Sequence, residues 1–146
     1  PSLYAANGER YGGATIRSVC HEMHQFYKSR DIKGLQRKCF RAESFPELAM
    51  LPQDAYRALV GNEVDYLPLD QCKGRIAATL ALIYPPGIGV VVPGERWDDR
   101  AKPMLDYLHA FEESFNRFPG FNYEVQGVFQ EKVDGRIVFH SYVVRE

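Results

Sequence analysis

The sequence has few cysteines, no excess of charge of either sign and no long apolar run. Its three cysteines, Cys20, Cys39 and Cys72, are odd in number and widely spaced, so neither a disulfide framework nor a CxxC metal site is indicated. Free thiols are typical of a reducing compartment, and we expect the cytoplasm. The net charge of −1 gives no global field that would attract nucleic acid or an anionic membrane. No stretch approaches the roughly 18 apolar residues that span a membrane.

Familiar signatures of catalysis are missing too, among them the Gly-rich phosphate loop, the dinucleotide fingerprint, the serine nucleophile elbow and a Cys/His pairing. His21 and His24 can share one face of a helix, but no third ligand is evident, so solvated or packing histidines are the simpler interpretation than a metal pair. Glu112 and Glu113 are adjacent on a helix and point in different directions, which builds no acid–base pair. These residues and patterns therefore indicate no metal site and no recognisable catalytic signature.

The composition is that of an ordinary globular protein. Hydrophobic residues make up 45% and charged residues 25%, which suits one domain over residues 1–146. Some exposed aromatic residues are expected to mark an interface with another domain or subunit. Most aromatic residues recur at core spacing and are not interleaved with Lys and Arg, so packing is favoured over nucleic-acid stacking: Phe26, Tyr27, Phe111, Phe115, Phe118, Phe121 and Phe129.

Helical periodicity appears in four segments, each with recognisable ends. Thr15 is a good N-cap, a break is expected near Asp31, and Pro52 suits a first helical turn. The helices are expected from Thr15 to about Arg30, from Ile32 to about Phe40, from Pro52 to Gly61-Asn62 and from about Asp99 to Arg117.

Alternating and apolar runs indicate strands elsewhere, with an irregular lead-in over residues 1–13 and a turn over Asp70–Gly74. The Asp134-Gly135 pair between two alternating runs is a strong hairpin signal. The class is therefore α+β: N-terminal helices, a small mixed or antiparallel sheet, one long helix and a C-terminal β-hairpin. Strands are expected at Glu63–Leu69, Arg75–Tyr84, Ile88–Val92, Val125–Val133 and Arg136–Val144.

The segment from Tyr84 to Glu95 contains a rigid corner. Two prolines followed by glycine force an extended entry and a sharp turn between two apolar strands. On physical grounds a structural crossover is the simpler interpretation, and the alternative is a fixed loop that lines a pocket shared with another domain. The candidate residues for this corner are Tyr84, Pro85, Pro86, Gly87, Gly94 and Glu95.

The string Tyr84-Pro85-Pro86-Gly87-Ile88, followed by Val92-Pro93-Gly94-Glu95, resembles the YPPG(I/V)…PGE signature of the bacterial PLP-dependent, fold type I ornithine, lysine and arginine decarboxylases. Residues 91–97 and 125–128, together with Gly89, look most like the ornithine branch. The resemblance covers nearly the whole chain, because further similar runs occur in the same order: 22–24, 45–46, 52–55, 74–78 and 118–121.

The resemblance implies that this chain is the C-terminal domain of a larger cytoplasmic subunit, which forms a homodimer that can assemble further. The parent enzyme would decarboxylate a small basic amino acid, with ornithine giving putrescine and CO2 favoured over lysine and arginine. PLP would be bound outside this chain, because the Ser-x-His-Lys context of the cofactor lysine has no match here, so the chain alone should be inactive. Its role would be to support the oligomer and the approach to the active site.

A second hypothesis is a stand-alone assembly or regulatory module without catalysis. A reading frame that starts at Pro1 after a single Met would favour the module, whereas one that continues upstream through Ser-x-His-Lys would favour the enzyme. If the chain is a domain that has lost its natural neighbours, it is expected in isolation to self-associate or to expose an apolar face.

Overall fold

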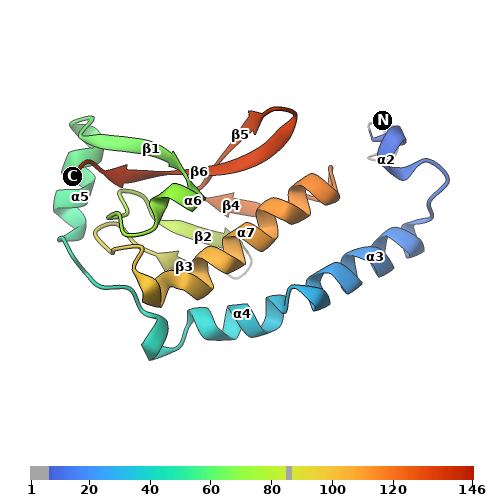
Figure 1. Cartoon of the computed structure of the whole chain (residues 1–146), viewed down its shortest axis with the longest axis horizontal. Helices are drawn as coiled ribbons and strands as arrows, with labels where there is room; N and C mark the ends of the chain where they lie inside the picture. Colours follow the sequence, from blue (N-terminus) through green and yellow to red (C-terminus); the bar gives the residue numbers. More distant parts are fainter. Residues whose placement is uncertain (1–6, 85–86) are drawn as a thin grey trace.

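The computed structural model describes residues 7–84 and 87–146 and has three layers (Figure 1). The long helix α7 (Lys102–Arg117) runs through the middle, with β-sheets on one side and the helices α3 (Ile16–Ser29) and α4 (Ile32–Cys39) along the other. The α+β class is confirmed, and so is the long helix close to its expected bounds. A 3-10 turn, η2 (Asp99–Ala101), leads into α7, and its cap Asp98 accepts hydrogen bonds from the backbone.

The N-terminal helices end where the sequence predicts. Thr15 and Ser18 form a reciprocal capping box, in which each side chain accepts the other's backbone N–H at 3.1 and 2.9 Å. Asp31 adopts a left-handed conformation with φ 47°, which interrupts the helix, and its carboxylate caps α4 by accepting the Gly34 N–H at 3.2 Å. The two helices therefore form one bent strip along α7.

The lead-in differs from the expectation of an irregular segment. Gly8–Tyr11 forms the one-turn helix α2, and residues 1–6 lie outside the described residues. The reason is tertiary: the Tyr11 side chain is buried and donates a hydrogen bond from its hydroxyl to the Pro119 carbonyl at 3.0 Å. This contact fastens the start of the described chain to the end of α7.

Within the described residues the strands form two antiparallel three-stranded sheets. The first has the order β1-β6-β5, with β6 in the centre, and the second has the order β3-β2-β4. The predicted hairpin is confirmed, since β5 and β6 pair from Val133↔Arg136 outward. The strands are β1 (Val64–Pro68), β2 (Ala81–Tyr84), β3 (Ile88–Val91), β4 (Glu124–Gln126), β5 (Phe129–Val133) and β6 (Arg136–Val144).

Two expected strands and one turn need correction. The run 125–133 is divided at Gly127, which has φ +72°, so β4 joins one sheet and β5 the other. The run 75–84 is regular only from Ala81, because Ile76 and Ala77 make isolated bridges to Arg96 and Val143 instead. The expected turn after β1 contains a one-turn helix, α6 (Leu69–Cys72). For the two strands, contacts distant in sequence decide the local conformation.

The main core lies between α7 and β6, where Phe115 and Phe139 meet edge to face at 5.2 Å between ring centroids. Burial of each such side chain contributes about 1.5–3 kcal/mol. A smaller core lies under α5 (Pro52–Val60), where Ala55 and Ala58 cover the Val144 end of β6. A 3-10 turn, η1 (Ala42–Ser44), connects α4 to this part of the chain. Across the described ranges, no helix has the length and apolar character needed to cross a membrane.

Candidate functional site

The structure separates the predicted corner into two ends of the β2–β3 hairpin. We call Tyr84, Gly87 and Ile88 the tip, and Gly94 and Glu95 the base. Pro85 and Pro86 lie outside the described residues. The tip side chains face outward, with Tyr84 54% and Ile88 53% exposed. The corner is therefore an exposed apolar tip held by a base at the other end of the hairpin, and its role in lining a pocket stays a prediction.

The base is a junction of three chain segments. The Gly94 N–H donates to the Ala77 carbonyl at 2.8 Å, and the Gly94 carbonyl accepts from Ala49 and Met50 N–H at 3.0 and 3.1 Å. Gly94 has φ +90°, and a Cβ there would overlap the Met50 carbonyl oxygen. Only glycine fits this position without distortion, because it tolerates positive φ and has no Cβ. The PGE motif thus ties the segment before α5 to the segment before β2.

Glu95 uses its carboxylate to close its own loop. Its Oε2 accepts the Val92 N–H at 2.8 Å, and the Glu95 side chain is half-buried. Burial raises the pKa of Glu95 above its ordinary value, the Val92 N–H opposes this rise, and the nearby Asp98 adds to it. The arrangement gives Glu95 a structural task within the base.

We predict different outcomes for two substitutions of Glu95. Glu95→Gln keeps an acceptor for the Val92 N–H and removes the charge, so stability at pH 7.5 should stay within about 0.5 kcal/mol of wild type or rise. Glu95→Ala removes the acceptor and should cost about 1 kcal/mol. Urea unfolding, followed by fluorescence of Trp97, measures both.

The pH dependence of stability distinguishes the effect of the Glu95 charge from the effect of its hydrogen bond to Val92. Because the folded-state pKa of Glu95 is raised, the folded protein binds this proton more readily than the unfolded chain does, and its contribution to stability increases as the pH falls through that pKa. The advantage of Glu95→Gln over wild type should therefore be larger at pH 7.5 than near pH 4.5. An advantage that grows toward low pH would contradict this account.

The other candidate residues lie apart from one another and from the corner. His21 and His24 are both exposed on α3, and among the residues that the structure describes no group of three or more His, Cys, Asp or Glu is placed to hold a metal ion. Cys20 is exposed, whereas Cys39 and Cys72 are buried. Burial raises the pKa of both buried thiols to about 12, so neither is a ready nucleophile.

The adjacent glutamates diverge as predicted. Glu113 binds Arg30 at 2.6 Å across the gap to α3, while Glu112 accepts the Phe139 N–H at 2.5 Å from β6.

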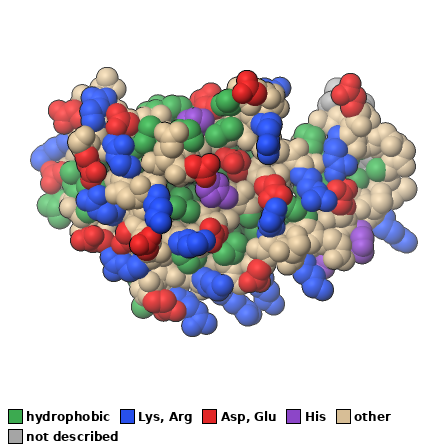
Figure 2. All heavy atoms as spheres, viewed as in Figure 1, with side chains coloured by type: hydrophobic (Ala, Val, Ile, Leu, Met, Phe, Trp, Pro, Cys, Tyr) green, Lys and Arg blue, Asp and Glu red, His purple; other side chains and the backbone are tan. Residues whose placement is uncertain are grey.

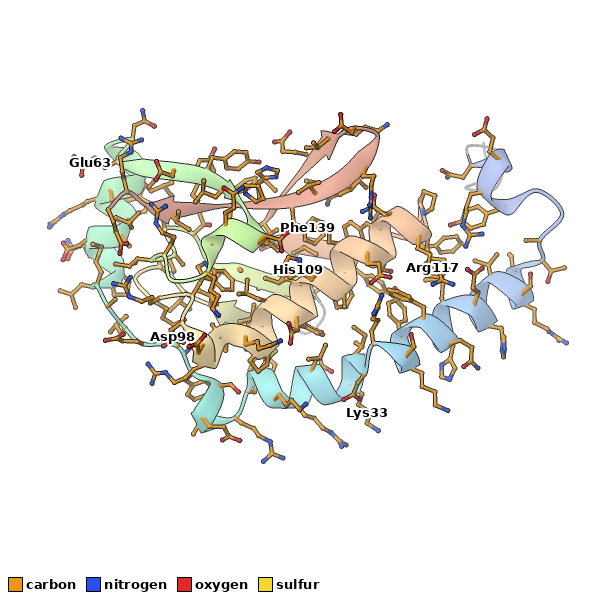
Figure 3. All side chains as sticks on the ribbon, viewed as in Figure 1. Lys33, Glu63, Asp98, His109, Arg117 and Phe139 are labelled. Atoms are coloured by element: carbon orange, nitrogen blue, oxygen red, sulfur yellow. The ribbon has the colours of Figure 1, made fainter. Side chains whose placement is uncertain are left out.

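Glu112 also lies 3.9 Å from Nδ1 of His109, whose Nε2 is 3.1 Å from Asp70. Glu112 raises the pKa of His109, burial opposes the rise, and Asp70 and then Asp106 add to it. Figure 3 labels His109 on α7 and Phe139 on β6. The i, i+3 spacing of His109 and Glu112 is the sequence signal for this pair.

Exposed apolar side chains concentrate in the segment that leads into and forms α5, which we call the 45–60 apolar segment. On the face of the molecule shown in Figure 2, acidic and basic side chains are interspersed. A surface of this kind is typical of an interface between domains or subunits. Its exposed members are Phe45, Leu48, Leu51, Tyr56 and Val60.

A second aromatic area, half-buried except for Phe129, lies on one face of the first sheet. The Tyr66 ring lies 4.7 Å from Tyr142, 5.0 Å from His140 and 6.0 Å from Phe129, and its hydroxyl donates to Glu131 at 2.8 Å. The α5 helix covers only the far end of this face.

Core packing is confirmed for Phe26, Phe111, Phe115 and Phe118, which are buried, but not for Phe129, which is 41% exposed.

Comparison with known proteins gives a consistent result over the whole chain. Residues 33–145 match the family model "Orn/Lys/Arg decarboxylase, C-terminal domain". The inducible ornithine decarboxylase of Escherichia coli K12 is 46% identical over 99% of this chain and 19% of its own length. Lysine decarboxylase LdcA of Pseudomonas aeruginosa is 38% identical over 93% of this chain and 18% of its length.

Solved structures agree with the sequence relatives. Lysine decarboxylase A from Pseudomonas aeruginosa superposes with a TM-score of 0.88 at 32% identity, over 99% of this chain and 19% of that one. The constitutive lysine decarboxylase of E. coli gives 0.86 at 30% identity, over 99% and 20%. The chain thus spans about a fifth of the length of the relatives it matches. It belongs to the Orn/Lys/Arg decarboxylase C-terminal domain family.

Proposed function

We propose that this chain serves as the C-terminal domain of a basic amino acid decarboxylase that converts ornithine into putrescine and CO2. The proposal rests on sequence identity, which is higher to ornithine decarboxylases than to lysine decarboxylases. Ornithine decarboxylases from three bacteria are 41–46% identical to nearly all of this chain, whereas the lysine decarboxylases are 30–38% identical.

The decarboxylation chemistry is assigned to other domains of the parent subunit. PLP, the proposed cofactor, supplies an electron sink for the loss of CO2 and is held through a lysine. All six lysines of this chain are exposed on its surface, at positions 28, 33, 38, 73, 102 and 132. A Schiff-base lysine needs a desolvated pocket to lower its pKa, so the lysines of this chain do not fit the cofactor.

The contribution of this chain is a docking surface. Within the proposed subunit the 45–60 apolar segment packs against a neighbouring domain, and the Tyr84–Ile88 tip reaches toward the approach to the active site. Burial of side chains such as Leu51, now 63% exposed, would stabilise that contact by about 1.5–3 kcal/mol each. The base is suited to hold the tip in place, because it fixes β3 through backbone hydrogen bonds on both sides.

Assembly and location follow from the same proposal. The parent enzyme would be a homodimer that can assemble further, with the aromatic face around Tyr66 as an additional contact surface. The cytoplasm is the proposed compartment, because Cys20, Cys39 and Cys72 are all free thiols.

A chimera tests the proposed function. Residues 1–146 replace the C-terminal fifth of the E. coli inducible ornithine decarboxylase, and release of putrescine and CO2 from ornithine is measured. We expect activity within about tenfold of the parent enzyme, since the domain should dock through a similar surface. Leu51→Asp in the chimera should abolish most of this activity, because it places a charge in the proposed contact.

The controls separate docking from folding. Lys132→Gln, an exposed change on the β5–β6 hairpin, should leave activity unchanged. The isolated chain, incubated with PLP and reduced with borohydride, should show no stoichiometric adduct by mass spectrometry. A soluble chimera that binds PLP but is no more active than the enzyme truncated before this domain would instead support the stand-alone module.

A further inference from the structure

An open cavity of about 410 Å³ is lined by residues of α3, α4 and α7 and by Tyr123, which immediately precedes β4. Its size falls in the range of small-molecule sites, about 300–1,000 Å³. Neither the corner nor the 45–60 apolar segment contributes to its lining. It is therefore separate from every feature that the proposed function uses.

The floor of this cavity is a cluster of three aromatic rings. Tyr27 from α3, Phe111 from α7 and Tyr123 from the segment before β4 lie 5.4–6.2 Å apart between centroids. Phe111 is buried, and the Tyr27 hydroxyl is fixed by a 2.7 Å hydrogen bond to Ser114, so the floor is rigid where it meets α7. Tyr123 is 37% exposed and leaves an open aromatic surface.

The rim of the cavity carries basic groups. His24 and Lys28 are one turn apart on α3, and Lys33 lies in the first turn of α4. Among the described residues neither lysine makes an ion pair, whereas ten Arg and Lys side chains elsewhere do. No Asp or Glu lines the cavity. The rim thus carries two lysines without acidic neighbours in the lining, beside an apolar floor.

We propose that this cavity binds a small aromatic anion: one planar ring bearing a phosphate or carboxylate. The ring lies against Tyr27, Phe111 and Tyr123, where stacked or edge-on aromatic contacts are favourable. The anionic group faces Lys28 and Lys33, whose ammonium groups donate charge-assisted hydrogen bonds to it. A ligand with only a ring would leave Lys28 and Lys33 unpaired, and a ligand with only a negative charge would leave the Tyr123 ring surface uncovered.

Titration with phenyl phosphate tests this proposal. Two control ligands are titrated in parallel: inorganic phosphate, which has the negative charge but no ring, and benzyl alcohol, which has the ring but no charge. Isothermal calorimetry and shifts of the Tyr123 and Lys28 resonances report binding. We expect phenyl phosphate to bind at least tenfold more tightly than either fragment, and more weakly as salt is raised. Equal binding of phenyl phosphate and one fragment would overturn the proposal.

Matched variants locate the site. Lys28→Gln and Lys33→Gln each should weaken phenyl phosphate about three- to tenfold and leave benzyl alcohol unchanged, whereas Lys132→Gln should change neither. All three residues are exposed, so the variants should fold alike. Wild-type affinity in both rim variants would refute the assignment. Binding to the isolated chain that is absent in the decarboxylase chimera would also overturn it, because the cavity would then be a contact between domains.

Discussion

Replacing Gly94 with alanine is expected to reduce the free energy of unfolding by about 3 kcal/mol. Positive φ costs a non-glycine residue about 1 kcal/mol or more. The new Cβ would also overlap the Met50 carbonyl oxygen, so the segment before α5 must move. That movement weakens the hydrogen bonds that Ala49 and Met50 donate to Gly94, each contributing about 1 kcal/mol.

Guanidinium unfolding followed by Trp97 fluorescence measures this loss, because Trp97 is the single tryptophan and is fully buried two residues after Glu95. Gly135→Ala is the matched control: it has φ +79° at the hairpin turn, but nothing lies within 4 Å of the added Cβ. In the control, the free energy of unfolding should fall only by the cost of placing alanine at positive φ, about 1 kcal/mol. Equal losses at Gly94 and Gly135 would show that the contact with Met50 is unimportant.

Gly127→Ala is expected to have an effect at least as large, about 3 kcal/mol or more, for a related reason. Gly127 has φ +72°, and a Cβ would run into the Leu80 carbonyl oxygen immediately before β2. The Gly127 carbonyl also accepts a hydrogen bond from Thr79 Oγ1 at 3.1 Å. Displacing this residue should therefore separate β4 from β2 as well as lower global stability.

Amide hydrogen exchange distinguishes the two consequences. In Gly127→Ala, exchange should accelerate most in β4 and β2, where Leu82 pairs with Gln126, and least in the β5–β6 hairpin beyond it. In Gly135→Ala the pattern should reverse, with the hairpin turn affected first. Uniform acceleration across both sheets in Gly127→Ala would indicate a loss of global stability alone.

The sequence predicts the local elements well and the division between sheets poorly. Thr15, Asp31 and Pro52 act within one or two turns of themselves, so the helix starts they predict are confirmed. Gly127 looks like a strand glycine in isolation. Its effect depends on the close approach of Leu80, about fifty residues earlier, which no local pattern reveals.

The candidate corner shows the same limit. The proline and glycine pattern predicts a turn, and its neighbours Tyr84 and Ile88 are found at an exposed hairpin end. That Gly94 joins three segments is invisible in sequence, because its partners are backbone groups of Ala49, Met50 and Ala77 whose side chains carry no signal. The basic rim of the α3–α7 cavity is also missed, since Lys28 and Lys33 read as ordinary solvated charges until Phe111 and Tyr123 are placed beside them.

The position of β6 has a consequence for how the chain acquires its structure during synthesis. This strand is the last in order, yet it is the centre of the first sheet, with β1 pairing on one side through Val64↔Val144. While a ribosome elongates the chain, helices α3 and α4 and the β2–β3 hairpin can form early, but β1 must wait without a partner. Pairings so distant in sequence are slow to form, and waiting strands are prone to aggregate. Chaperone dependence should therefore be concentrated in the interval between the synthesis of Val64 and that of Val144.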